Sequence, residues 1–391
     1  MTSRAAAVAL VTFAAFIDLV AYSVAVPVLP DLSRRLGASP TVIGLLFSSF
    51  GLTLVLVSLP MGTVSDRIGR RLPLVLGMVA LAASTLLFAY ADSLAWLFAA
   101  RLVQGAADAV TWVVGFALVA DLYGPSERGK VMGLVMAGSN AGFMIGPSLG
   151  GWLYERGGMA LPFLTTAVLA GVAAVGFLWL RPPSTQMARE AVPLASVLQA
   201  RQVRACVLAV TLAAATLAML EPVVSLWLAS NLGLRPSRVG LLFGIAAVAS
   251  TGLHPIYGRL ADRWGARRLM LTGLVVTALV MPVLSRASSF ETAVVLYVMM
   301  AASMSLIVTP SLSYMAEAMS TFGVGSFGVA YGLYNFSWGI GLIVGPAAGG
   351  FLFETLGFTR LTLVWSPIVI VLTILVARAA STTRVAVVRP V

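Results

Sequence analysis

The chain of 391 residues has one cysteine, one histidine and few charged side chains. Because Cys206 is the only cysteine, an intramolecular disulfide and a cysteine-based structural zinc site are excluded. The single histidine, His254, and the absence of an HExxH motif leave no metal-ligand cluster of the metalloprotease type. We therefore expect a protein that is not an enzyme and that needs no metal and no cofactor.

The shortage of charge is matched by a surplus of apolar residues. Hydrophobic residues make up 60% of the chain and charged residues 10%, and the mean hydropathy is +0.99. Such a composition leaves too little polar surface for a water-soluble globule. The chain is therefore predicted to be an integral membrane protein.

Apolar runs of about 18 to 28 residues recur along the chain, and about 20 helical residues cross the hydrocarbon core of a bilayer. They predict an all-α, polytopic membrane protein with twelve transmembrane helices in two six-helix bundles. The approximate limits of the crossings are residues 6–30, 41–64, 73–91, 95–121, 131–153, 160–181, 205–231, 237–260, 269–286, 292–316, 326–352 and 359–379.

A repeated charged signature divides the chain into two parts. Its first copy, Gly62, Asp66, Arg67, Gly69, Arg70 and Arg71, recurs 196 residues later as Gly258, Asp262, Arg263, Gly265, Arg267 and Arg268. The longest polar stretch lies between the sixth and seventh crossings. We therefore expect an N-terminal six-helix bundle over residues 1–181, a cytoplasmic linker over 182–204, and a C-terminal six-helix bundle with a short basic tail over 205–391.

The distribution of lysine and arginine predicts the orientation. With the amino terminus inside, 17 of these residues fall in inner segments and 7 in outer segments, and Arg101 lies within a crossing. We expect a multi-pass monomer in the cell inner membrane with both termini in the cytoplasm. The net charge of +11 follows from this bias and needs no nucleic-acid partner. A cleaved signal peptide over the first crossing is disfavoured, because the apolar run is long and contains Asp18.

Four ionisable residues lie inside predicted crossings: Asp18, Arg101, Asp108 and Glu221. A charge at the bilayer centre costs at least about 2.5 to 3.5 kcal/mol, so such residues usually face the bundle interior and carry a function. A carboxylate in that position can hold a proton or a cation in turn. We predict that Asp18 and Glu221 carry protons, and that Asp108 and Arg101 take part in proton coupling.

Structural roles for the same residues are the alternative. Arg101 is the obvious partner to neutralise one of the acids, and it could also anchor helix packing. Asp108 lies seven residues after Arg101, two turns along the same helix face, so the two could complete a buried charge network. For His254, beside Pro255, a packed and hydrogen-bonded role is favoured over a proton relay.

Glycine and proline recur at matching places in the two halves. The residues are Gly142, Gly146, Pro147 and Gly150 in the fifth crossing and Gly341, Gly345, Pro346 and Gly349 in the eleventh. Glycines at a spacing of four let another helix approach closely. The match between the halves predicts a rocking interface between the two bundles, and a static helix contact is the alternative.

In combination these motifs resemble the signature set of the major facilitator superfamily. They are GTVSDRIGRR from Gly62, GRLADRWGARR from Gly258, RLVQG around Arg101 and GPSLGG in the fifth crossing. The glycine-proline pattern resembles the twelve-span drug:proton antiporters, which implies export by exchange.

A narrower resemblance concerns three other segments. The segment of Asp18 with the following VAVPVLP, AMLEP around Glu221, and YGLYNFSWGIGLIVGPAAGG around Asn335 are similar to the vesicular amine (monoamine) transporters. That group exchanges protons for cationic amines. The resemblance implies that Asp18 binds the amine and that Glu221 takes part in proton coupling and substrate binding.

Three positions depart from the pattern of the vesicular amine transporters. A lysine in the second crossing and an aspartate in the eleventh, which pair with each other in that group, align here with Phe50 and Asn335. An acid of the tenth crossing aligns with Ser305. Because both members of the pair are missing together, no unpaired charge is left. With fewer titratable sites, the exchange stoichiometry of that group cannot be carried over.

The repeated charged loops are expected to gate the protein. An acid at the inner end of the second crossing can hold basic side chains or a helix N-terminus, and the resemblance implies such a brace between the halves in the outward-open state. The expected gating residues are Gly62, Asp66, Arg67, Arg70, Arg71, Asp262, Arg263, Gly146, Pro147, Gly345 and Pro346.

Together these features predict a proton-coupled antiporter that exports small organic cations, amines or drugs, by alternating access. A midplane cavity between the bundles would open to either face in turn, with Asp18 and Glu221 shared between proton and substrate. Aromatic rings bind organic cations by cation–π contact. The expected substrate-binding residues are Asp18, Glu221, Phe47, Trp112, Trp227, Tyr331, Asn335 and Trp338. The alternative is a proton symporter or a facilitator for a neutral small solute.

Overall fold

The computed structural model describes residues 4–180, 200–320 and 326–380, and within these ranges every regular element is a helix. The first half contains α1 (Arg4–Ser23), the short helices η1 (Val26–Val28) and α2 (Leu29–Leu36), then α3 (Pro40–Ile68), α4 (Arg71–Tyr90), α5 (Leu94–Leu122), α6 (Pro125–Gly157) and α7 (Ala160–Trp179). The second half contains α9 (Arg201–Asn231), α10 (Pro236–Trp264), α11 (Ala266–Val280), η2 (Met281–Arg286), α12 (Phe290–Ser320) and α13 (Ser326–Ala380). Most of the predicted linker and the basic tail lie outside the described residues.

Ten described segments are long and apolar enough to cross a membrane. The helix α6 is not among them, because its glycines and polar residues lower its hydropathy. The segment in α13 counts once, although Gly357, at a φ of 75°, breaks it into two helices. With α6 and the second part of α13 added, the twelve predicted crossings are accounted for. The expected fold class, an all-helical multi-pass membrane protein, is confirmed.

Proline and glycine set the helix ends at equivalent places in both halves. Helices α3 and α10 begin with Pro40 and Pro236, whose missing N–H is not needed in a first helical turn. Both helices end at a glycine with positive φ, Gly69 at 84° and Gly265 at 88°. Because side chains rarely adopt this conformation, glycine is required where the chain turns after each Asp-Arg pair.

The two glycine stripes pack inside the halves. The stripe of α6 (Gly142, Gly146 and Gly150) meets α1, and the stripe of α13 (Gly341, Gly345 and Gly349) meets α9. A side chain at any of these positions would overlap atoms of the neighbouring helix. The prediction that these glycines form an interface between the bundles is therefore wrong. They let two helices of the same half approach closely, as small residues do in membranes.

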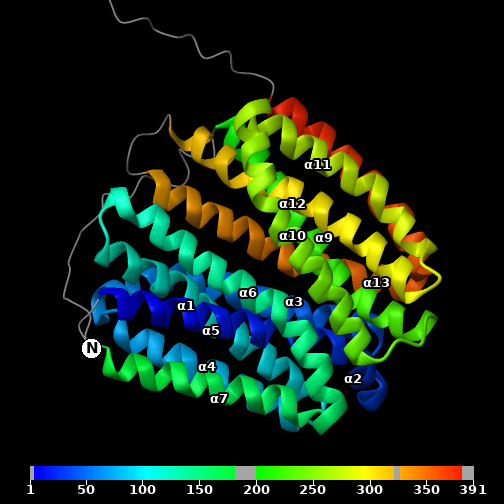
Figure 1. The fold of residues 1–391 in the computed structure, drawn as a ribbon, viewed down its shortest axis with the longest axis horizontal. Coiled ribbons are helices and arrows are strands. Elements are labelled where there is room, and N and C mark those ends of the chain that lie inside the picture. Colours follow the sequence, from blue (N-terminus) through cyan, green and yellow to red (C-terminus); the bar gives the residue numbers. More distant parts are fainter. Residues whose placement is uncertain (1–3, 181–199, 321–325, 381–391) are drawn as a thin grey trace, which may run out of the picture.

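The two halves meet along two pairs of helices, α3 with α13 and α6 with α10. Figure 1 shows the first half, coloured blue to green, beside the second half, coloured green to red. The predicted gating prolines do lie in these contacts: the carbonyl oxygen of Pro346 faces Gly44, and that of Pro147 faces Gly240. The hydroxyl of Ser148 also donates to the carbonyl oxygen of Gly240 at 3.1 Å. The interface between the halves is therefore built around the prolines and not around the stripes.

The contacts between the halves gather toward one end of the helices, where α3 and α10 begin, and we call this the closed end. Near mid-length, Gly339 of α13 still faces Val55 of α3. Farther along, a Cβ placed at Gly62, Gly252 or Gly258 would have no atom of the opposite half within 4 Å among the residues that the structure describes. We call this other end, which carries the repeated charged loops, the open end.

Candidate functional site

The four ionisable residues inside the predicted crossings are all buried, on α1, α5 and α9. The exposed fractions of Asp18, Arg101, Asp108 and Glu221 are 1%, 0%, 4% and 3%. These values place the side chains inside the bundle and not against lipid. They also mean that a proton or a cation reaches the acids only after surrounding helices or side chains move. The four residues fall into two groups.

The first group consists of Asp18, Asp108 and Trp112. The indole N–H of Trp112 donates to Oδ1 of Asp108, one turn earlier on α5, at 3.1 Å. The carboxyl groups of Asp18 and Asp108 interact with each other, and Trp112 interacts with both. Within the described ranges, Oδ2 of Asp18 has no hydrogen-bond partner. Two buried carboxyl groups that interact electrostatically are strongly disfavoured from being charged together without a proton or a cation beside them, and we call Asp18 and Asp108 the acid pair.

The second group joins the two halves. The hydroxyl of Tyr22, on α1, donates to Oε2 of Glu221, on α9, at 2.6 Å. The guanidinium of Arg101, on α5, interacts electrostatically with both residues, and its central carbon lies 5.6 Å from the centroid of the Tyr22 ring. Glu221 therefore has a hydrogen-bond donor and a positive charge beside it, both supplied by the first half.

Arg101 is held by aromatic rings and an amide. Its central carbon lies 4.2 Å from the ring centroid of Phe47 and 5.0 Å from that of Phe88, and Nη1 donates to Oε1 of Gln104 at 2.9 Å. Its Nε and Nη2 have no hydrogen-bond partner among the described residues. None of the ion pairs found among the described residues involves Arg101. The alternative of a buried charge network between Arg101 and Asp108 is not supported, because the guanidinium turns toward these rings.

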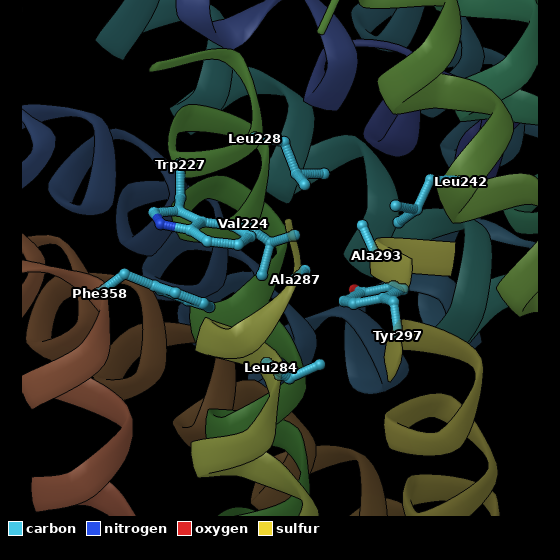
Figure 2. Close-up of a pocket in the computed structure, with 9 residues that line it drawn as sticks. All are labelled: Val224, Trp227, Leu228, Leu242, Leu284, Ala287, Ala293, Tyr297 and Phe358. Atoms are coloured by element: carbon cyan, nitrogen blue, oxygen red, sulfur yellow. The ribbon is translucent and has the colours of Figure 1, made fainter. Parts of the chain in front are cut away.

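Trp227, a predicted substrate residue, lies at a small pocket inside the second half. Its ring stacks on Phe358 with the centroids 4.5 Å apart, and Figure 2 shows the two side chains together. The pocket is lined by Val224, Trp227, Leu228, Leu242, Leu284, Ala287, Ala293, Tyr297 and Phe358. Its volume is 10 Å³, about the space that one water molecule needs, so no organic cation fits into it as it stands.

The other aromatic and polar candidates are placed in different ways. Phe47 is 1% exposed, and both the guanidinium of Arg101 and the ring of Tyr22 pack against it. Trp338 stacks on a neighbouring tyrosine of α13 with the centroids 6.4 Å apart. Asn335 is exposed, and the side chain of Tyr331 lies outside the described part of the structure. Roles for these residues in substrate binding stay predictions.

Three residues of the site are absent from the sequence predictions: Tyr22, Phe88 and Gln104. Tyr22 follows Asp18 by four residues, and Gln104 follows Arg101 by three, so helical spacing places each beside a predicted residue. That spacing is the signal that could have found them. Phe88 has no such signal, because its partner is on a different helix.

His254 has a hydrogen-bonding partner within the second half. Its Nδ1 lies 2.6 Å from Oγ1 of Thr309, and that hydroxyl donates to the carbonyl oxygen of Ser305 at 2.8 Å. The contact agrees with the expected role of a packed, hydrogen-bonded histidine.

The first charged loop is braced within its own half. Arg70 pairs with Asp66 at 2.6 Å and with Asp121 of α5 at 2.9 Å. In the second loop, Asp262 and Arg263 are exposed at the open end. A brace between the halves at this end requires the halves to close there, so it stays a prediction for the alternate conformation.

Two carboxylates connect the halves at the closed end. The backbone N–H of Thr41, in the first turn of α3, donates to Oε2 of Glu354 on α13 at 2.9 Å. The backbone N–H of Ser237, in the first turn of α10, donates to Oε1 of Glu155 on α6 at 3.0 Å. The two contacts are equivalent in the two halves. A carboxylate at a helix N-terminus satisfies an unpaired N–H and interacts favourably with the helix dipole, so both contacts stabilise the closed end.

Glu354→Gln is expected to loosen the closed end at neutral pH. Glu354 lies in the connection between the two predicted crossings of α13, where hydrogen bonds from Thr41 and Ser39 hold its pKa below the usual value. The contact is therefore fully present at a pH above the usual pKa of glutamate. It is lost as the pH falls through the lowered pKa of Glu354. We expect the population separated at the closed end to rise about two- to fivefold at neutral pH. Wild type and variant should converge in acid.

The measurement is the distance between spin labels at Asp92 and Ser288, exposed positions in connections of the first and second halves. Glu291→Gln is the matched control, because the interactions that the described residues show for this exposed acid at the start of α12 are with groups of its own half. Equal distance distributions for Glu354→Gln and Glu291→Gln at neutral pH would show that the closed end does not depend on this contact.

A bundle of membrane-crossing helices in two halves, which meet along paired helices and bury acids among them, is the architecture of a membrane transporter. The sequence agrees with this class. The model of the Major Facilitator Superfamily matches residues 11–205 and, separately, residues 206–390. The chain belongs to the Major Facilitator Superfamily, a family of transporters and not of enzymes.

Individual relatives show which members of this family the chain resembles. The chain is 28% identical over 368 residues to the probable vesicular acetylcholine transporter-B of Danio rerio, with 90% of this chain and 75% of that protein covered. It is 27% identical over 332 residues to the synaptic vesicular amine transporter of Rattus norvegicus, covering 84% of this chain and 64% of the relative's length. The predicted resemblance to the vesicular amine transporters is confirmed.

A solved structure supports the fold. A bacterial homolog of the human lysosomal transporter Spinster, in an inward-facing and occupied conformation, aligns with a TM-score of 0.83 and 15% identity over 96% of each chain. At this low identity, the likeness concerns the fold and carries no information on the substrate.

Proposed function

We propose that this protein is a proton-coupled antiporter that exports small organic cations, amines or drugs, by alternating access. The acid pair carries the proposal. Asp18 and Asp108 interact inside the bundle while nearly fully buried, and among the described residues no basic side chain forms an ion pair with either. Buried charge without a partner is strongly unfavourable, so the pair needs a proton or a cationic ligand from outside.

The relatives support a cationic ligand over a neutral one. Their names refer to acetylcholine and to amines, and both kinds of molecule carry a positive charge at neutral pH. The ring of Trp112, beside both acids, adds an aromatic surface of the kind that binds organic cations.

The exchange of protons for cations follows because both bind at the acid pair. When the acid pair is empty and charged, its charges oppose movement of the halves through the apolar membrane region. When it holds a proton or a cation, the charge is reduced and the halves can rock about the seams of α3 with α13 and α6 with α10. Protonation from outside then displaces the cation, and deprotonation inside admits the next one. Glu221 takes part as a third acid, outside the acid pair, whose charge changes during the cycle.

The orientation completes the proposal. With both termini in the cytoplasm and the protein in the cell inner membrane as a monomer, the closed end of the bundle faces outward and the open end faces the cytoplasm. The protein would then be in an inward-facing conformation, in which a cation from inside reaches the buried acids once the surrounding side chains move.

A flux experiment tests the function. The purified protein is reconstituted into liposomes, a pH gradient is imposed, and uptake of labelled organic cations is compared with uptake of neutral solutes of similar size. We expect cations to move only together with an opposing flux of protons, and uptake to stop when the gradient is dissipated. Movement of a neutral solute, with or without protons, would instead establish the symporter or facilitator alternative and defeat the proposal.

A further inference from the structure

Tyr22 forms the hydrogen bond that links a buried charged group of one half to the other half. Its hydroxyl lies 2.6 Å from Oε2 of Glu221, and Tyr22 itself is 7% exposed. One turn farther along, Ser225 of α9 donates to the carbonyl oxygen of Val26 at 2.6 Å. The end of α1 and the segment after it are therefore joined to α9 by two hydrogen bonds, of which only the first involves a group that can change its charge.

The ring of Tyr22 is fixed independently of its hydroxyl. It packs edge-on against Phe47 with the centroids 6.2 Å apart and lies against Phe50 at 5.0 Å. These contacts aim the hydroxyl at Glu221 from the first half. Replacing Tyr22 by phenylalanine would remove the hydrogen bond and keep these ring contacts.

Other polar groups face Glu221 from two further elements. Arg101 of α5 and Tyr297 of α12 both interact with it electrostatically. Arg101 forms no ion pair with Glu221 within the described ranges. Tyr297 belongs to the same half as Glu221 and makes no hydrogen bond to it among the described residues, since its ring packs against Phe243. Tyr22 is thus the group that joins Glu221 to the opposite half by a hydrogen bond, while Arg101 of that half acts on the same charge electrostatically.

We propose that Tyr22 is a positioning residue that couples the charge on Glu221 to the arrangement of the two halves. A phenol donates a strong hydrogen bond to a carboxylate and a weaker one to a protonated carboxyl group. Deprotonated Glu221 therefore stabilises the observed arrangement, open at the end of the charged loops, and protonation weakens the link so that the halves can move. This role deepens the proposed function, because it gives Glu221 a conformational role beside that of the acid pair. The hydrogen bond also keeps the empty, deprotonated protein from changing to the opposite arrangement.

The test measures conformation and needs no known substrate. Spin labels are placed at Thr63 of α3 and Trp264 of α10, exposed positions at the open end, with Cys206 replaced by alanine. The population with a long distance at this end is followed during a pH titration of the full-length protein. In wild type we expect this population to fall on acidification. Tyr22→Phe should move the midpoint upward by about one to two pH units, because a hydrogen bond to a charged group is lost.

Two further variants separate coupling from general structural support. Tyr297→Phe also removes a tyrosine hydroxyl near Glu221, but it leaves the hydrogen bond between the halves in place, so its midpoint should match that of wild type. In a Glu221→Gln background, Tyr22→Phe should have no further effect on the titration. Glu155 and Glu354 are unchanged in every variant, so any loss of their contacts in acid is common to all the titrations and does not alter these comparisons.

Three results would overturn the assignment: a wild-type titration without a pH-dependent population, equal midpoints for wild type and Tyr22→Phe, or an equal shift in Tyr297→Phe. The outcome is independent of the flux experiment. If the midpoint shifts as expected while no cation is transported in liposomes, the proposed function fails and the role of Tyr22 stands.

Discussion

Asp18→Asn is expected to abolish the exchange of organic cations for protons and to leave the protein folded. An amide has nearly the shape of a carboxyl group, but it neither takes up a proton at this site nor neutralises an amine. The carboxylate of Asp18 and a bound cation form a buried charge pair. Removing one partner of such a pair costs about 3 to 5 kcal/mol, which corresponds to a loss of at least about a hundredfold in affinity for the cation. The measurement is the initial rate of cation uptake into proteoliposomes under an imposed pH gradient.

Asp92→Asn is the matched control for this experiment. Asp92 is an exposed acid between α4 and α5, so its change to asparagine should leave uptake at the wild-type rate. A single symmetrical peak in size-exclusion chromatography shows that each variant is folded. Wild-type uptake by a folded Asp18→Asn variant would mean that the acid pair is not the exchange site.

Gly345→Leu is expected to prevent the second half from assembling. A Cβ at Gly345 would overlap the main-chain carbonyl group of Ala215 on α9. A side chain could turn aside, but a main chain cannot move without shifting the whole helix. The destabilisation should therefore exceed the roughly 1 to 3 kcal/mol that is typical of overpacking. The yield of monodisperse protein in detergent and the midpoint of thermal unfolding measure this effect.

The same substitution elsewhere in α13 provides the control. Gly332 is exposed, and beyond its own helix backbone no atom of the described residues lies within 4 Å of the position that its Cβ would take. Gly332→Leu should therefore give the wild-type yield and unfolding midpoint. If Gly345→Leu were as stable as Gly332→Leu, the close contact of α13 with α9 would be wrong.

The class of fold was open to prediction because the bilayer leaves few choices. Each crossing must satisfy its backbone hydrogen bonds internally, so a long apolar run becomes a helix whatever surrounds it. The repeated Asp-Arg signature also marked the same turn in both halves, and Gly69 and Gly265 occupy it with nearly the same φ. These features are local, and local sequence is sufficient to specify them.

The buried acids could be predicted for a similar reason, but their partners could not. A charge inside an apolar run stands out, so Asp18 and Asp108 are visible in the sequence. Which side chains meet depends on how each helix is rotated and crossed against its neighbours. Arg101 therefore faces aromatic rings instead of Asp108.

The glycine stripes are a second case in which the sequence reveals a feature but not its partner. Their spacing correctly indicates a smooth helix face around Gly146 and Gly345. It does not indicate which helix occupies that face, and in the structure the occupants are α1 and α9 of the same half. The contact between the halves includes instead the carbonyl groups of Pro147 and Pro346, which face Gly240 and Gly44. The sequence pattern indicated these two prolines but not the helices that they face.

Competition between a proton and an organic cation for the same buried acids is tested most directly by counting protons. Binding of a transported cation to the purified protein is followed by calorimetry in two buffers that differ in ionisation enthalpy, and the difference in heat gives the number of protons released. We predict proton release on binding by wild type and none by Asp18→Asn. Binding of the cation to wild type with no proton released at any pH would contradict the shared site.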